Sequence, residues 1–516
     1  MPLTGTPLAA PVRTADLLRR GLESGADSPA LVTLGSRMTW RELDAAATNL
    51  AGNLLALGLR PGDRIASLMP NRIGLLIHYI ACMRAGLVAV LLNYRYMPPE
   101  IDRALEVSGA AMLLAHAERD RDLAGSRLAG RLKYGQITFE AHEDRRPSFE
   151  ALAAAPTGSG LPTPDPTAAA FILFTSGSTG PAKGVSHSLE SIGWLLASTA
   201  AGWELSGRDV VLPGSSLSHL GGLARSLAAL SVGARVLVAK TFDDHELLNM
   251  LREGRPTVLG ILPAALSSLV CSRSAVRQDF HSLRLCVCSS DRVPRQLARE
   301  FTELTSLLIN ESFGMTEAGL IAINPPSGTI KQGSVGRVAP GTTLSIRDRD
   351  GKEVPTGDQG VLWVKSQSLT IGYWNDATAT VATISDGWLD TGDIMRADRD
   401  GYLYFCGRKK QIIVYDGSNI APQEVEEALL EHDAVESAGV VGVPDLLHGE
   451  KVCAFVTIRE SAVRPTMQAL IEFTRARVGY KAPETIVFLK EMPFSSAGKV
   501  DRTVLKRMAA PDRSAG

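Results

Sequence analysis

The sequence predicts an α/β fold, in which a large N-terminal domain of parallel-rich sheets flanked by helices precedes a small α+β C-terminal domain. Three observations predict it. Apolar runs of strand length alternate with helical patterns early in the chain, which favours a parallel sheet covered by helices on both faces. From about residue 334 short runs with turn signals replace that alternation. A strand-then-helix pattern restarts in the last hundred or so residues, and 516 residues suit about three lobes.

Each element follows from a local pattern. Apolar residues at helical spacing predict a helix over 41–59, and a second apolar helix over 74–86 ends near a glycine. Residues 155–168 are rich in Pro, Gly, Ser and Thr and read as a loop. The predicted strands are 64–68, 87–92, 169–174 and 411–415, and a helix is expected over 422–430. We place the N-terminal domain at 1–407, its β-rich subdomain at about 334–407 and the C-terminal domain at 408–516.

Composition excludes several function classes. Lys and Arg number 54 against 55 Asp and Glu, so the dense basic field of a nucleic-acid-binding protein is absent. The six cysteines are scattered, which argues against a disulfide framework or a zinc site and for a reducing, cytoplasmic location. Cys286 and Cys288 would share one buried strand face. We expect no secretory signal and no transmembrane segment. Oligomeric state is left open.

The segment Thr175–Val185, TSGSTGPAKGV, is the most informative one. A buried strand runs into a loop of small and hydroxyl residues that ends with Lys183. Such a loop lets backbone N–H groups approach an anion, and a lysine adds a fixed charge. It lacks the Walker A pattern. The pattern indicates phosphate binding, with a flexible surface loop as the alternative.

Two further segments carry weaker signals. Glu311–Glu317, ESFGMTE, offers an aromatic ring and a hydroxyl next to a carboxylate that could hold Mg²⁺ bridged to phosphates. Its alternative is a helix N-terminus with Thr316 as the cap. Trp388–Asp393, WLDTGD, ends in an aspartate that could bind a sugar's vicinal hydroxyls or could simply stabilise a tight turn.

Together with GRKKQII at 407–413 and AGK at 497–499, these ordered motifs resemble those of the adenylate-forming superfamily. That family includes acyl-CoA synthetases, luciferase-like enzymes and carrier-protein adenylation domains. The resemblance extends from Leu92 to Lys499 and so covers most of the chain. It implies two half-reactions in one site. A carboxylate attacks the α-phosphate of ATP to give an acyl-adenylate and pyrophosphate, and a thiol then displaces AMP.

The resemblance implies roles for individual residues. The loop Thr175, Ser176, Gly177, Ser178, Thr179, Gly180 and Lys183 would hold the β- and γ-phosphates. Thr316 would contact phosphate, and Glu317 would hold Mg²⁺. Lys499 would stabilise charge at the α-phosphate during adenylation. The remaining ATP- or AMP-binding residues would be Asp291, Arg292, Glu311, Ser312, Phe313 (stacked on adenine), Gly314, Met315, Asp393 (on the ribose) and Arg408.

The resemblance also implies a moving C-terminal domain and an acyl pocket. Lys410 would be the hinge, and Gly417, Ser418 and Asn419 would line a pantetheine tunnel. Without the motif, Lys410 would read as a surface lysine. The acyl pocket would include His219, Leu220, Gly221, Ser289, Ser290 and Gly314, although a surface role for His219 stays open. No acidic residue occurs in 213–224, which argues against an α-amino acid substrate. Ser289–Arg292 departs from the family's usual small residues.

We therefore expect an ATP-dependent acid–thiol ligase that uses Mg²⁺ and CoA, of the acyl- or aryl-CoA synthetase type. The alternatives are a stand-alone enzyme that loads a carrier protein's phosphopantetheine arm, an enzyme that passes the adenylate to an amine, and a non-catalytic binding protein. The retained Lys499, Glu317 and Asp393 argue against the last. The acid itself is not identified by the sequence, because a fold does not transfer substrate identity.

Overall fold

The computed structural model describes residues 2–140, 148–158, 160–175, 183–271, 274–289, 293–415, 418–445, 449–460, 462–495 and 499–509. The chain forms two compact units. The first unit comprises Leu3–Leu344 and Val364–Leu389, and the second comprises Met1–Pro2, Ser345–Trp363 and Asp390–Gly516. The expected division at residue 407 and the expected mobility of the C-terminal part stay predictions.

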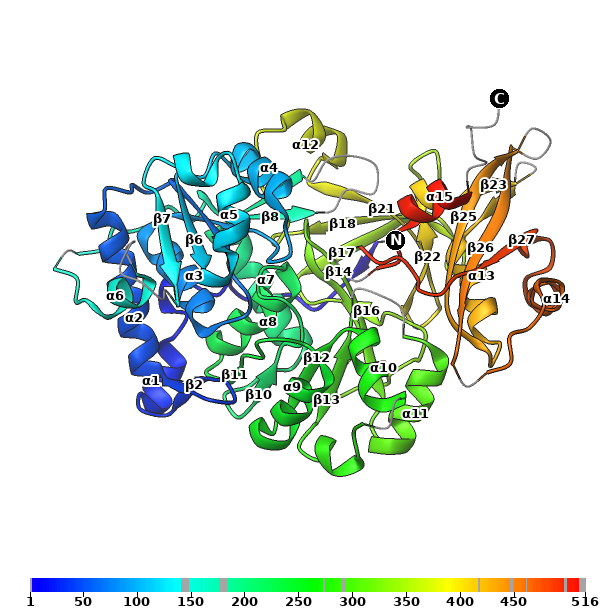
Figure 1. Ribbon diagram of the computed structural model, residues 1–516, viewed down its shortest axis with the longest axis horizontal. Helices are drawn as coiled ribbons and strands as arrows, with labels where there is room; N and C mark the ends of the chain where they lie inside the picture. Colours follow the sequence, from blue (N-terminus) through cyan, green and yellow to red (C-terminus); the bar gives the residue numbers. More distant parts are fainter. Residues whose placement is uncertain are drawn as a thin grey trace. The chain divides into compact units, whose positions relative to one another are not determined.

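A seven-stranded sheet forms one layer of the first unit (Figure 1). Its five strands from β8 to β7 are parallel, and antiparallel pairing adds the last two. Expected strands 64–68, 87–92 and 169–174 are confirmed here. In spatial order the strands are β19 (Gly372–Tyr373), β9 (Lys183–Ser188), β8 (Ala169–Thr175), β5 (Val88–Leu91), β4 (Arg64–Leu68), β6 (Met112–His116) and β7 (Gln136–Phe139).

A nine-stranded sheet forms the other large layer. Its central strands are parallel, as expected for α/β architecture, and its two edges are closed by antiparallel strands. In spatial order they are β16 (Arg337–Val338), β15 (Gly319–Ile323), β14 (Ile309–Met315), β13 (Leu285–Cys288), β12 (Val258–Ile261), β10 (Val210–Leu212), β11 (Arg235–Leu237), β2 (Pro29–Val32) and β3 (Arg37–Thr39).

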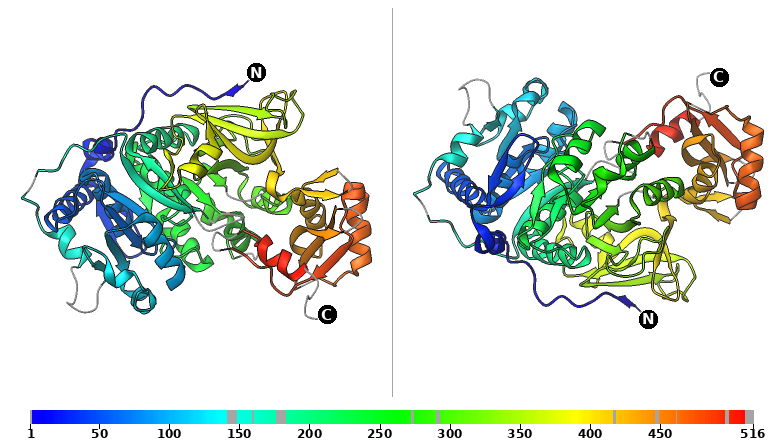
Figure 2. Two further views of the ribbon diagram at one scale, coloured as in Figure 1. Left: turned by 90° about the horizontal axis from the view of Figure 1, so that it is seen from above. Right: turned by 90° about the horizontal axis from the view of Figure 1, so that it is seen from below.

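Helices cover both sheets. They are α1 (Arg19–Gly25), α2 (Trp40–Ala56), α3 (Ile73–Ala85), α4 (Pro98–Ser108), α5 (Asp120–Gly125), α6 (Phe149–Ala154), α7 (Leu189–Gly202), α8 (Leu220–Ser231), α9 (Asp244–Asn249), α10 (Pro263–Cys271), α11 (Arg295–Thr305) and α12 (Ala377–Thr383). One apolar core joins side chains of α2, α3, α7 and α8 to both sheets. The blue and cyan sheet accordingly lies beside the green one in both views of Figure 2.

The two helices expected from periodicity form for identifiable reasons. Helix α2 begins at a capping box, in which the Thr39 hydroxyl accepts from the Glu42 amide and the Glu42 carboxylate accepts from the Thr39 amide. Helix α3 is almost wholly buried and ends at Gly86, whose φ of 70° is the left-handed conformation that glycine adopts without strain. No helix among the described residues is long and apolar enough to cross a membrane.

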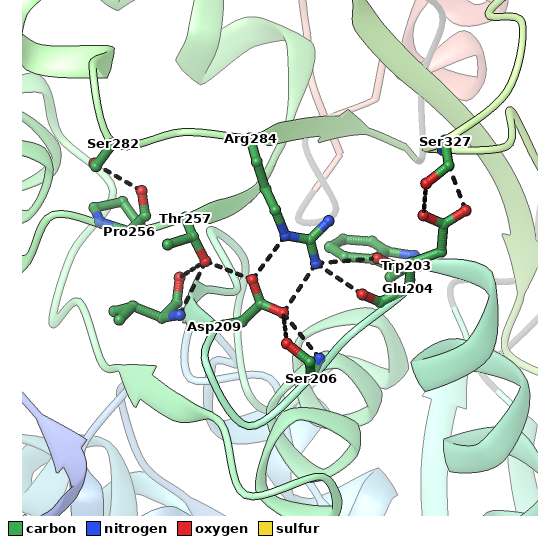
Figure 3. A network of polar contacts seen from close by, with 10 residues as sticks. Trp203, Glu204, Ser206, Asp209, Pro256, Thr257, Ser282, Arg284 and Ser327 are labelled. Carbon is green, nitrogen blue, oxygen red and sulfur yellow. Dashed lines mark hydrogen bonds and ion pairs between the residues drawn. The ribbon is translucent and has the colours of Figure 1, made fainter.

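A polar network fastens the amino-terminal edge of the nine-stranded sheet (Figure 3). Asp209 precedes β10, Thr257 precedes β12 and Arg284 precedes β13. The buried Asp209 carboxylate accepts from Arg284 Nε at 2.7 Å and from Thr257 Oγ1 at 2.8 Å, and these contacts hold its pKa down at about 2. This ionic cluster stabilises three strand ends, at the edge opposite to the one where the candidate site residues lie.

A six-stranded sheet contains β1 (Leu3–Thr4), β17 (Thr342–Arg347), β18 (Gly360–Ser366), β21 (Trp388–Ala397) and β20 (Ile384–Ser385), with β22 (Leu403–Arg408) paired to β21. The unit boundaries fall within β17, β18 and β21. These short strands fit the β-rich character expected from the turn signals of this region.

The remaining chain of the second unit forms a five-stranded sheet with its own apolar core. Its order is β24 (Ser418–Ile420), β23 (Ile413–Tyr415), β26 (Gly449–Ile458) and β25 (Val435–Asp445), with β27 (Thr485–Phe488) on β26. The helices are α13 (Pro422–Leu430), α14 (Met467–Val478) and α15 (Arg502–Ala509). The α+β pattern and the helix at 422–430 are confirmed. Cys286 and Cys288 are buried on β13, as expected from their spacing.

Candidate active site

The first and last residues of the predicted phosphate-binding loop lie side by side on two neighbouring strands. Thr175 closes β8, Lys183 opens β9, and the two residues are direct partners in the antiparallel register. Residues 176–182 lie outside the described residues, and with them Ser176, Gly177, Ser178, Thr179 and Gly180. Lys183 is exposed and is the first residue of β9.

Tyr373 connects Lys183 to Glu317. The Lys183 ammonium lies 4.9 Å from the centroid of the Tyr373 ring, and the Tyr373 hydroxyl donates to Glu317 Oε1 at 3.0 Å. Burial and the Glu317 charge raise the pKa of Tyr373, so its hydroxyl stays protonated and can donate. Two groups predicted to bind phosphate and metal are therefore joined through one side chain that the sequence analysis did not single out.

Thr316 and Glu317 follow β14 in a turn that leads into β15. The helix N-terminus considered for this segment is therefore excluded. The ladder shifts register between Phe313 and Gly314, so the strand bends where the aromatic ring emerges half-buried. A Cβ on Gly314 would lie 2.4 Å from the Gly319 carbonyl oxygen, which explains why glycine stands there.

A histidine of the seven-stranded sheet contacts the turn at Thr316 and Glu317. The Nε2 atom of His187, on β9, is 2.8 Å from the Thr316 carbonyl oxygen, and its Nδ1 atom is 3.2 Å from Ser191 Oγ. Burial lowers the pKa of His187 to about 4, so the neutral ring donates from Nε2 at pH 7. The Thr370 amide also donates to the Glu317 carbonyl at 2.7 Å. Sequence reasoning missed His187, since one buried histidine carries no pattern.

The other ATP-binding candidates on β14 differ in exposure. Glu311 and Ser312 are buried, and Glu311 Oε1 accepts from the Gly333 amide at 2.9 Å. Gly314 is exposed and Met315 is half-buried at the end of the strand. Of these four residues, only Gly314 and Met315 are therefore accessible to solvent.

In the second unit, Asp393 and Arg408 are cross-strand partners on β21 and β22. Asp393 is fully buried, and its Oδ1 accepts from Arg408 Nε at 2.7 Å. Its Oδ2 is buried without a hydrogen-bond partner among the residues that the structure describes. Burial raises the pKa of Asp393, against the opposing charges of Arg408 and of the exposed Lys499. This carboxylate therefore keeps one buried acceptor atom that no described donor satisfies.

The acyl-pocket candidates gather around the start of α8 and the end of β13. His219 is the half-buried residue before α8, Leu220 is buried and Gly221 is exposed. Ser289 is buried directly after β13. Ser290, Asp291 and Arg292 lie outside the described residues, so the departure at 289–292 is described only at Ser289.

The hinge and tunnel candidates are described only in part. Lys410 lies in a single 3₁₀ turn, Lys409–Gln411, between β22 and β23. Ser418 and Asn419 begin β24, and only their backbone is described. Gly417 lies outside the described residues. Their predicted roles remain predictions.

The candidate segments on the nine-stranded sheet share one topological position. Strands β10, β12, β13 and β14 run parallel, and Pro213, Ser289 and Thr316 each follow the carboxyl end of one of them. Ligands of open α/β sheets bind at that edge. The arrangement thus brings the segments predicted to form the acyl pocket and the segment predicted to bind phosphate and metal to one sheet edge.

Comparison with known proteins decides the family. Residues 18–374 match the AMP-binding enzymes, and residues 424–499 match the AMP-binding enzyme C-terminal domain. The chain belongs to the AMP-binding enzyme family. The adenylate-forming resemblance inferred from the motifs is confirmed.

Several proteins named as CoA synthases or CoA ligases match this chain over nearly its whole length. A feruloyl-CoA synthase of Amycolatopsis is 32% identical over 480 residues, 92% of this chain and 94% of that protein. A long-chain-fatty-acid–CoA ligase of Yersinia pestis is 30% identical over 515 residues, which are 93% of this chain and 92% of that protein. The solved benzoate CoA ligase of Burkholderia xenovorans superposes with a TM-score of 0.85 at 28% identity, and the superposition covers 96% of this chain and 99% of that one. These comparisons confirm an adenylate-forming enzyme of the acyl-CoA synthetase type.

Proposed function

We propose that this family member is an AMP-forming acid–thiol ligase that works on a small-molecule carboxylic acid, ATP and CoA. The acid's carboxylate oxygen attacks the α-phosphorus, and the bond to the β-phosphate breaks to release pyrophosphate. The CoA sulfur then attacks the acyl carbon, its proton is lost, and the bond to AMP breaks. A carboxylate is a poor electrophile, and the adenylate supplies the good leaving group.

The observation that supports nucleotide binding is Asp393 Oδ2, which has no hydrogen-bond partner among the described residues. A fully buried carboxylate oxygen without a donor is costly. A ribose provides adjacent hydroxyl donors that would satisfy it. Arg408, which already donates to Oδ1 at 2.7 Å, would hold the carboxylate in place.

We assign the phosphates to the Thr175–Lys183 segment and to Thr316, and adenine to Phe313 and the neighbouring Gly314 and Met315. Among the described residues no group of three or more metal-ligating side chains occurs. Mg²⁺ commonly binds one or two carboxylates together with substrate phosphates, so Glu317 fits such a site with ATP supplying the other oxygens. When bound, Mg²⁺ would neutralise phosphate charge.

We assign Lys499 to the α-phosphate during adenylation, Lys410 to the hinge, and Gly417, Ser418 and Asn419 to the pantetheine tunnel. Lys499 lies close enough to Asp393 to lower the pKa of that carboxyl, which supports a place near the nucleotide. We also propose a cytoplasmic location, in keeping with five free thiols among the described residues.

The test is pyrophosphate release from ATP and Mg²⁺ over fatty, aromatic and alicyclic acids, with and without CoA. The proposal requires release with at least one class, and thioester and AMP when CoA is present. Adenylate that CoA leaves untouched would point to a carrier-protein thiol or an amine as acceptor. Absence of ATP binding, measured by calorimetry, would overturn the enzyme proposal.

A further inference from the structure

A buried guanidinium lies at the carboxyl-terminal edge of the nine-stranded sheet. Arg225, on the second turn of α8, is only 7% exposed. Its Nη1 donates to the Pro213 carbonyl at 3.1 Å and to Ser215 Oγ at 3.4 Å. Its Nη2 donates to Ser289 Oγ, and its Cζ lies 5.1 Å from the Trp203 ring centroid.

All of these partners are neutral. No carboxylate among the described residues forms an ion pair with Arg225, and the one other titratable group acting on it is the protonated thiol of Cys288. Burial lowers the pKa of Arg225 to about 10, so the group is still a cation at pH 7. Buried charges are normally paired. A guanidinium has five N–H donors, and these three acceptors leave part of that donor capacity unused.

The cation stands among residues assigned to the acyl pocket. Ser289 receives its Nη2 hydrogen bond. A Cβ on the exposed Gly221 would lie 3.7 Å from the same Nη2, and a Cβ on Gly260 of β12 would lie 3.2 Å from Nη1. Two glycines therefore flank the guanidinium without placing a side chain against it, and one of them, Gly221, is exposed and lies two residues after His219.

We propose that Arg225 is a specificity-determining residue for an acid with a second carboxylate on its tail. One carboxylate would be adenylated, and the other would receive the unused Arg225 donors, because guanidinium and carboxylate form paired, charge-assisted hydrogen bonds. The inference rests on the proposed ligase function and names its substrate class as dicarboxylic acids.

The experiment compares aliphatic and aromatic dicarboxylic acids with their monomethyl esters, which keep the carbon skeleton and lose one charge. Hydrogen bonds to charged groups predict kcat/KM for the best diacid about 10- to 100-fold above that of its ester. Arg225→Gln should abolish this preference by raising KM for the diacid, with the ester within about threefold of wild type. Arg225→Lys should retain part of it.

Arg284→Gln is the matched control, because Arg284 lies at the opposite edge of the same sheet and should affect stability without changing the diacid preference. Thermal melts report whether each variant folds. The inference is overturned if wild type shows no diacid preference, or if Arg225→Gln lowers diacid and ester equally.

Direct binding separates this inference from the ligase proposal. Calorimetric titration with the diacids alone should show binding to the wild type that Arg225→Gln loses. Such binding without pyrophosphate release from any acid would support the proposed role of Arg225 in binding diacids and would overturn the ligase proposal. Absence of diacid binding together with turnover of the esters would overturn the proposed role of Arg225 and support the ligase proposal.

Discussion

The hydroxyl of Tyr373 donates to the Glu317 carboxylate at 3.0 Å, across 56 residues of sequence. The same ring lies 4.9 Å from the Lys183 ammonium. One side chain thus orients the carboxylate proposed for Mg²⁺ and contacts the lysine proposed for phosphate. Groups that orient a metal ligand commonly affect metal affinity as strongly as some ligands do.

Tyr373→Phe should therefore raise the Mg²⁺ concentration for half-maximal pyrophosphate release by about 10-fold, because it removes the hydrogen bond and keeps the ring. Tyr373→Leu should additionally raise the KM for ATP, since it also removes the ring beneath Lys183. The measurement is a Mg²⁺ titration at saturating acid. An unchanged Mg²⁺ requirement in Tyr373→Phe would show that the hydroxyl has no part in orienting Glu317.

Lys499→Gln should lower the adenylation rate about 100- to 1,000-fold, because one preorganised charge at the transition state is lost. Thioester formation from chemically prepared acyl-adenylate should stay within a few-fold of wild type. The two half-reactions are measured separately by pyrophosphate release and by thioester yield. Lys506→Gln, an exposed lysine on α15, is the control. Equal losses in both half-reactions would contradict the assignment of Lys499 to adenylation.

Asp393→Asn should raise the KM for ATP about 10-fold, since charge-assisted hydrogen bonds to the ribose would be replaced by weaker neutral ones. Wild type should discriminate against 2′-deoxy-ATP and 3′-deoxy-ATP. The variant should lose most of that discrimination, which a general loss of stability would not produce. The comparison is of kcat/KM for the three nucleotides, and retained discrimination in Asp393→Asn would exclude Asp393 from the ribose site.

Acid should destabilise the chain already above pH 5. Burial lowers the pKa of His78 to about 3 and that of His187 to about 4, against 6.5 in an exposed chain. Below pH 6.5 the unfolded chain binds protons that the folded chain does not. Stability contributed by neutral burial is therefore present above pH 6.5 and is lost as the pH falls toward 4. Each histidine should contribute about 1.4 kcal/mol per pH unit within that window.

His187→Gln keeps a donor for the Thr316 carbonyl and should remove about half of the dependence of the unfolding free energy on pH. Urea unfolding of wild type and variant at pH 7 and pH 5 measures this dependence. The window avoids Asp209, whose pKa of about 2 against 3.8 makes its stabilisation disappear only at lower pH. Identical slopes in the two proteins would show that His187 does not titrate on unfolding.

Local patterns predicted much of the scaffold. The strand at 64–68 and the helix at 422–430 form with those bounds, because apolar spacing and a proline at the helix start act over a few residues. The family resemblance implied that Asp393 and Arg408 both bind the nucleotide, and the hairpin of β21 and β22 makes them cross-strand partners.

Other site features had no local signal. Tyr373, His187 and Arg225 look like ordinary strand or helix residues in the sequence. His187 reaches Thr316 over 129 residues, and Arg225 reaches Ser289 over 64. Such contacts depend on which strands become neighbours and on which strand ends meet at the same sheet edge.

The sequence by itself determined the family, the class of fold and the order of the motifs. The spacing of apolar residues and the order of chemical groups along the chain are properties of the linear sequence. The tertiary structure alone decided that one tyrosine joins Lys183 to Glu317, and that the Arg225 cation is buried without a carboxylate partner among the residues that the structure describes. Burial and pairing depend on the whole packed core, because the free energy of a charge is set by every group around it.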